Sequence, residues 1–225
     1  MLQEETVMYS HLRTPRAAAV AGIVFSILLV IIFWIFRGAV PADPLDPGTW
    51  LADGSRSVAL ALNLIPFAGI AFLWFIGVLR DRLGQREDRF FATVFLGSGL
   101  LFLATLFVAA TVVGALLLIA PTIEMTETSP APTFRFGRAV AYILFNVYAI
   151  KMAGVFMIST STVVIYTGIA PRWMAGIGYA LAALILLGSF YFSWSIMVLP
   201  IWVLLISVHI LIENLRRHDS SLDQQ

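Results

Sequence analysis

Cysteine is absent from this 225-residue chain, and lysine occurs only once. The lack of cysteine excludes disulfides, thiolate metal sites and cysteine nucleophiles. Charged residues make up only 12% of the chain, about half the share found in soluble domains. The formal net charge of +1 provides no basic patch of the kind that nucleic-acid binders carry. We therefore expect a membrane protein without a nucleic-acid partner.

Long apolar runs take up most of the sequence, which is 60% hydrophobic. A helix that spans a bilayer needs about 20 mainly apolar residues. The first run is longer than a signal-peptide core, so we expect it to be retained. We predict an all-α polytopic membrane protein, embedded in the lipid bilayer as a single domain of six transmembrane helices. The predicted helices are residues 17–36, 57–79, 91–120, 139–168, 173–191 and 195–212, and the polar tails are 1–16 and 213–225.

The arginines predict the orientation of these helices. Loops on the cytoplasmic side of a membrane carry an excess of arginine and lysine. If the N-terminus is cytoplasmic, nine arginines lie in cytoplasmic loops and tails and four in the outer loops. We therefore predict that both termini face the cytoplasm. The nine are Arg13, Arg16, Arg80, Arg82, Arg86, Arg89, Arg172, Arg216 and Arg217, and the four are Arg37, Arg56, Arg135 and Arg138.

Lys151 is the only charged residue deep inside an apolar run. Along a helix it is about 20 Å from Arg138 and about 31 Å from Arg172, which predicts a position near the middle of the membrane. A charge there costs at least about 2.5 kcal/mol, so Lys151 should face protein or water and have a partner. No aspartate or glutamate lies inside an apolar run to serve as that partner.

Four arrangements of Lys151 stay open at this point. The amine could be uncharged, or it could snorkel toward an interface. It could be charged and bound to neutral oxygens, from Asn63, Asn146 or backbone carbonyls freed at Pro66 or Pro200. It could also face an aqueous cavity and hold an anion.

Helical spacing places Tyr148, Gly154, Val155 and Thr162 on the face of Lys151. The candidate binding residues are therefore Lys151, Tyr148, Asn146, Asn63 and Thr162. No catalytic triad, metalloprotease motif or glycine-rich phosphate loop occurs. We therefore expect no catalytic residue, no metal site and no cofactor.

Three pairs of small residues recur four positions apart, a spacing that lets membrane helices approach closely. The pairs are Ala18 with Gly22, Ala110 with Gly114, and Gly178 with Ala182.

The stretch Gly77-Val-Leu-Arg-Asp-Arg-Leu-Gly-Gln-Arg86 resembles the signature between the second and third helices of major facilitator transporters. The resemblance implies a conformational latch in which Asp81 meets a helix N-terminus while Arg82 and Arg86 pair nearby. More broadly, the chain resembles small uncharacterised bacterial multi-pass membrane proteins, in phrases such as 68–77, 87–95 and 168–173. That resemblance implies a location in the bacterial inner membrane.

Three functions remain open. The leading expectation is movement of a solute or ion through the bundle, with Lys151 as the binding or selectivity residue, in a monomer or a homo-oligomer. The alternative is a non-catalytic accessory or scaffold protein that packs against another membrane protein. A membrane enzyme is the third, and we do not expect it.

Overall fold

The computed structural model describes residues 15–40, 50–83, 89–120, 132–188 and 194–222. These residues are almost entirely helical, and no strand occurs among them. The predicted all-α fold is thus confirmed. The helices are α2 (Pro15–Ala39), α3 (Trp50–Leu83), α4 (Arg89–Ile119), α5 (Pro132–Ile143), α6 (Ile150–Thr167), α7 (Arg172–Gly188) and α8 (Val198–Leu222). A π-helix, η3 (Leu144–Ala149), joins α5 to α6, and a 3₁₀ turn, η4 (Ser195–Met197), precedes α8.

Five of the apolar helical segments are long enough to cross a membrane. Helices suit that setting because each backbone polar group finds its partner within the same segment. The five are Ala17–Ala39, Gly54–Arg80, Phe91–Ile119, Pro132–Thr167 and Ser195–Arg216. The sixth apolar helix, Arg172–Gly188, is shorter, with 17 residues.

Several helices extend beyond the apolar runs that predict them. Residues 37–56 separate the first two predicted helices, but α2 continues to Ala39 and α3 already begins at Trp50. The loop prolines lie at 41, 44 and 47, inside the remaining interval, where they do not interrupt either helix. Likewise, residues 213–225 are predicted to form a polar tail outside the last helix, yet α8 continues to Leu222. Hydrophobicity marks the part of a helix in hydrocarbon, not the point where its hydrogen bonds stop.

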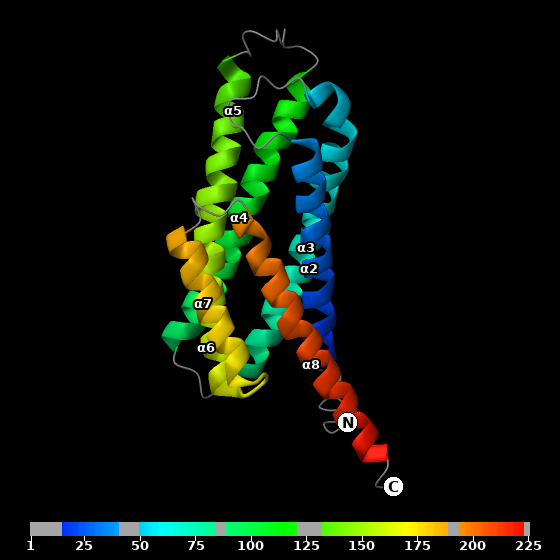
Figure 1. Cartoon of the computed structure of the whole chain (residues 1–225), viewed down its shortest axis with the longest axis vertical. Helices are drawn as coiled ribbons and strands as arrows, with labels where there is room; N and C mark the ends of the chain where they lie inside the picture. Colours follow the sequence, from blue (N-terminus) through cyan, green and yellow to red (C-terminus); the bar gives the residue numbers. More distant parts are fainter. Residues whose placement is uncertain (1–14, 41–49, 84–88, 121–131, 189–193, 223–225) are drawn as a thin grey trace, which may run out of the picture.

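The bundle consists of two groups of helices that share one core (Figure 1). α2 packs against α3 and α8, α6 packs against α4 and α7, and α3 meets α4. Aromatic rings fill the centre, around Phe72 of α3. Measured between ring centroids, Phe72 is 4.5 Å from Phe25 of α2 and 5.1 Å from Phe156 of α6. The ring of Phe102 of α4 is 5.5 Å away. α2 begins and α8 ends at the lower end of the bundle in Figure 1.

Two of the three small-residue pairs lie where helices meet closely. A side chain at Gly22 would lie 2.8 Å from a ring carbon of Phe75 and would also meet Ser207 of α8. Gly178 of α7 is in a similar position, because a side chain there would meet Ser161 of α6 and Trp202 of α8. Gly114 differs, because its nearest neighbour is a Leu62 methyl at an ordinary 3.8 Å.

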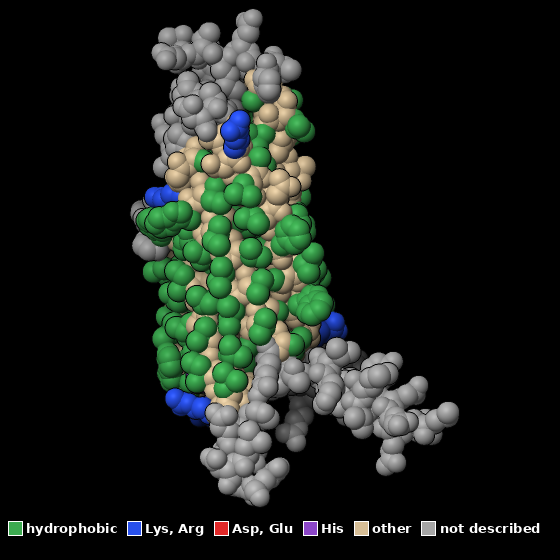
Figure 2. Space-filling model, turned by 90° about the vertical axis from the view of Figure 1, so that its right-hand side faces the viewer, with side chains coloured by type: hydrophobic (Ala, Val, Ile, Leu, Met, Phe, Trp, Pro, Cys, Tyr) green, Lys and Arg blue, Asp and Glu red, His purple; other side chains and the backbone are tan. Residues whose placement is uncertain are grey.

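The outer surface of the bundle is largely hydrophobic. On the side formed by α2 and α3, Figure 2 shows an apolar surface with lysine or arginine only toward its two ends. The exposed side chains include tryptophans such as Trp34 and Trp74, which are 68% and 66% exposed. A largely apolar surface of this size fits a bilayer and does not fit water.

Candidate functional site

The candidate site lies in the antiparallel hairpin of α6 and α7. α6 ends at Gly168, whose φ of 64° is the left-handed conformation that glycine adopts most readily. The Gly168 N–H donates to the Val164 carbonyl at 3.0 Å, which closes the last turn of the helix. Pro171 cannot continue α6, and α7 begins at the next residue, Arg172. This tight connection places α7 directly along α6.

Lys151 of α6 binds the C-terminal end of α7. Its ammonium donates to the Leu186 carbonyl, and the Ile185 carbonyl lies 3.5 Å away. α7 ends at Gly188, so these two oxygens belong to the last four carbonyls, which have no partner within the helix. The C-terminal end of a helix also carries partial negative charge. Nζ of Lys151 thus lies at a helix end that attracts positive charge.

Gly154 makes this contact possible. It lies one turn after Lys151 on the same face of α6, and a Cβ at this position would lie 2.7 Å from Cγ of Leu186. Since Gly154 has no Cβ, α7 can approach closely enough for the lysine to reach its carbonyls.

The position of Lys151 along the bundle follows from the length of α7. Leu186 is 14 residues after Arg172, or about 21 Å along the helix. Beyond the end of α7, the guanidinium of Arg37 lies over the ring of Trp194. The Arg37 Cζ is 4.7 Å from the centroid of that ring. Arginine and tryptophan are typical of membrane interfaces. The Lys151 side chain therefore lies nearer to the Arg37–Trp194 end of α7 than to Arg172.

The two candidate asparagines each use their amide within their own helix. Asn63 Nδ2 donates to the Ala59 carbonyl at 2.8 Å, and Asn146 Nδ2 donates to the Tyr142 carbonyl at 3.0 Å. Asn63 lies on α3 and is exposed. Tyr148 shares η3 with Asn146 and is 57% exposed. The structure therefore places none of these three side chains in the contact between Lys151 and α7.

Thr162 does belong to the same helix contact, at its other end. Its hydroxyl lies 2.8 Å from the Tyr179 hydroxyl of α7 and 3.0 Å from the Ile158 carbonyl. The predicted face of Lys151 is thus the face that packs along α7, with Lys151 near the end of α7 and Thr162 about 16 Å further along α6.

Three buried polar atoms have no hydrogen-bond partner among the described residues. They are Ser161 Oγ, Trp202 Nε1 and Ser207 Oγ. Ser161 and Trp202 meet at Gly178, where a Cβ would lie 2.6 Å from the indole ring and would collide with the serine hydroxyl. Trp202 and Ser207 are not among the residues predicted from the sequence. A signal for Trp202 was available, since it stands inside an apolar run and not at its end, where tryptophan is usual.

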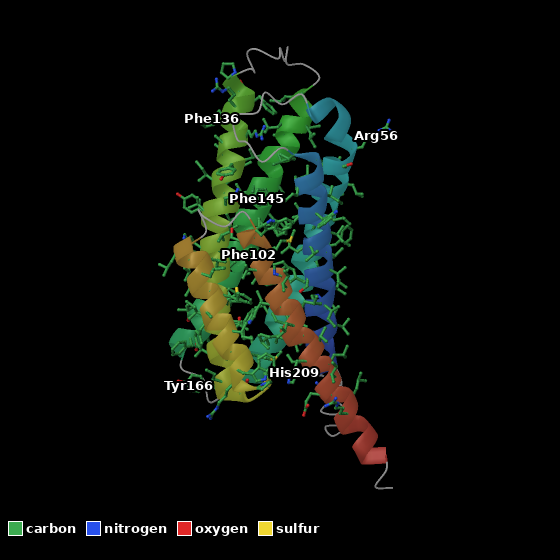
Figure 3. All side chains as sticks on the ribbon, viewed as in Figure 1. Arg56, Phe102, Phe136, Phe145, Tyr166 and His209 are labelled. Atoms are coloured by element: carbon green, nitrogen blue, oxygen red, sulfur yellow. The ribbon has the colours of Figure 1, made fainter. Side chains whose placement is uncertain are left out.

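A small apolar cavity lies between the two groups of helices. Phe102 and Phe145, labelled in Figure 3, are among its lining residues, and Ser195 is the one polar residue among them. Its volume is about 10 Å³, at the lower limit of what holds one water molecule. The cavity borders Ala149 and Ala153 of the π-helix and α6, which lie on the opposite side of the chain from Lys151.

The described residues contain no group of three or more His, Cys, Asp and Glu side chains that could hold a metal ion. The stretch from Gly77 to Arg86 is described only in part, since residues 84–88 and the side chains of Asp81 and Arg82 lie outside the described residues. Comparisons with protein-family models, curated proteins and solved structures find no match to this chain.

Proposed function

We propose that this chain crosses a bacterial inner membrane six times, with both ends in the cytoplasm. α7 supports the sixth crossing, because its 17 residues extend about 25 Å and the Arg37–Trp194 pair lies beyond its end. α2 begins and α8 ends at the same end of the bundle (Figure 1). This arrangement supports an even number of crossings. The distribution of arginines supports the cytoplasmic side for that end.

Within that membrane, the function that the geometry supports best is that of a non-catalytic scaffold that packs against membrane proteins. The observation that carries this proposal is the bond from Lys151 to the Leu186 carbonyl. It gives the one charge inside an apolar run a role in holding two helices together. A binding site for a transported anion would instead direct this ammonium into a cavity.

The test is a flux assay with the purified protein in liposomes. Uptake of a panel of monovalent anions and cations is compared for the wild type, the Lys151→Met variant and protein-free liposomes. We expect all three to be equal, and we expect deletion of the gene to lower the abundance of a stoichiometric membrane partner in the native host. Ion flux that the wild type supports and Lys151→Met abolishes would overturn the scaffold proposal.

Movement of a solute or ion is a second candidate function, favoured by a different observation. The unpartnered atoms of Ser161, Trp202 and Ser207 lie where α8 meets α7 and α2. Buried polar groups without partners are costly, so a second arrangement that hydrates them would be comparatively accessible. If the same flux assay gives transport that Trp202→Phe changes, this second candidate gains at the expense of the first.

A further inference from the structure

α3 presents a regular stripe of exposed residues to the membrane. Exposed positions follow each other at intervals of three and four residues, which is the spacing of helices that pack as a left-handed pair. The stripe from Leu60 to Gly77 is about 26 Å long and so covers most of the hydrocarbon layer. It consists of Leu60, Asn63, Phe67, Ile70, Trp74 and Gly77.

Asn63 sets this stripe apart from the other outer faces. The exposed stripe of α2, for example, consists of Val20, Val24, Ile27, Ile31 and Trp34. Exposed hydroxyls such as that of Thr111 donate to a carbonyl of their own helix, in this case that of Phe107. The Asn63 amide has more capacity: one of its two N–H groups donates to Ala59, which leaves the second N–H and the carbonyl oxygen to be satisfied.

Lipid cannot satisfy these groups, because hydrocarbon has no donors or acceptors. Asn63 is seven residues from Arg56, or about 10 Å below it along the helix. An asparagine side chain is too short to reach the interface from that depth, unlike the long stems of lysine and arginine. The exposed amide therefore favours a protein partner on this face.

We propose that the partner is a second copy of this chain, bound through the α3 stripe. Copies inserted in one orientation are related by a two-fold axis along the membrane normal, which places both Asn63 residues at the same depth. An amide is both donor and acceptor. Each Asn63 can therefore donate its second N–H to the carbonyl oxygen of the other, so that two reciprocal bonds satisfy both groups.

The rest of the stripe suits a close symmetric contact. Leu60, Phe67 and Trp74 are 55%, 61% and 66% exposed and would interdigitate with their counterparts. Nothing lies within 4 Å of the position that a Cβ of Gly77 would occupy, so the two backbones can approach at this point. The inference goes beyond the proposed function and does not rest on it, since both a scaffold and a transporter could form this dimer.

Disulfide cross-linking tests the proposal, because the natural chain has no cysteine. Leu60→Cys and Phe67→Cys report on the stripe. Leu101→Cys on α4 and Ile201→Cys on α8 are matched controls, since both residues are 56% exposed. The purified variants are oxidised in lipid vesicles at a high lipid-to-protein ratio. We expect the two stripe variants to form covalent dimers well above the level of the controls.

A second measurement tests the role of Asn63. Energy transfer between labelled copies, followed on dilution with lipid, should show the Asn63→Leu dimer to be about ninefold to nine-hundredfold weaker. The substitution removes both reciprocal bonds, and one polar bond between membrane helices is worth about threefold to thirtyfold. Asn146→Leu removes an amide outside the stripe and should leave the affinity unchanged. The proposal is overturned if the stripe variants cross-link no more than the controls. It is also overturned if Asn63→Leu associates as tightly as Asn146→Leu and the wild type. Neither result would bear on the flux assay.

Discussion

In hydrocarbon, the amine of Lys151 and the last carbonyls of α7 would each be destabilising without a hydrogen-bond partner, and each provides the partner of the other. A lysine ammonium needs acceptors, and the last carbonyls of a helix need donors. The bond from Lys151 to Leu186 supplies both. Water could serve either group at a protein surface, but not in the apolar layer. This is why one residue can have a measurable effect on the stability of the bundle.

We therefore predict that Lys151→Met destabilises the protein by about 1.5–3 kcal/mol, the net value of a hydrogen bond to a charged group. Methionine keeps the length of the stem and removes the donor. The free energy of unfolding in mixed micelles measures the effect. Arg80→Met is the control, because Arg80 is exposed at the end of α3 and should change stability by less than about 0.5 kcal/mol. Equal small effects of the two substitutions would contradict the assigned role of Lys151.

At the scale of helices, the seam between α6 and α7 depends on glycines at close contacts. Gly178 and Gly176 lie two positions apart on α7, but only Gly178 faces other helices closely. We predict that Gly178→Ala costs about 1–3 kcal/mol, as overpacking does, because its methyl group would collide with Ser161 and Trp202. Gly176→Ala should be neutral or stabilising by up to about 1 kcal/mol, because alanine favours a helix and nothing lies within 4 Å.

Thermal unfolding of both variants under identical conditions checks this pair. If Gly176→Ala lowered the stability as much as Gly178→Ala, the loss could not be assigned to the collision with Ser161 and Trp202. Ser161→Ala combined with Gly178→Ala should recover part of the loss, since it removes one of the two groups in collision.

Sequence patterns predict the helices better than the contacts between them. A run of apolar residues as long as a bilayer is thick has few other solutions than a helix. Helices overlap all six predicted segments, although a π-helix divides the fourth, and residues 189–191 of the fifth lie outside the described residues. The partner of Lys151 could not be predicted in this way, because Leu186 is 35 residues away and offers a backbone oxygen. Spacing alone also does not distinguish Gly178, which meets two helices, from Gly114, which does not.

For the whole molecule, the testable property is its orientation in the membrane. On the face drawn in Figure 2, hydrophobic side chains cover the bundle between ends that carry lysine or arginine. The basic residues of the loops therefore offer the signal for orientation. Nine arginines on one side against four on the other predict a cytoplasmic N-terminus. The first and third loops then face outward and the second faces the cytoplasm.

Single cysteines in the cysteine-free chain test this orientation directly. We predict that a membrane-impermeant maleimide labels Gly48→Cys in the first loop and Ser129→Cys in the third loop of intact cells. Gly84→Cys in the second loop should be labelled only after permeabilisation, which also shows that all three thiols can react. Labelling of Gly84→Cys alone in intact cells would invert the orientation. Labelling of Gly48→Cys without Ser129→Cys would mean that the segments between these loops do not both cross the membrane, and the six-helix topology would fail with it.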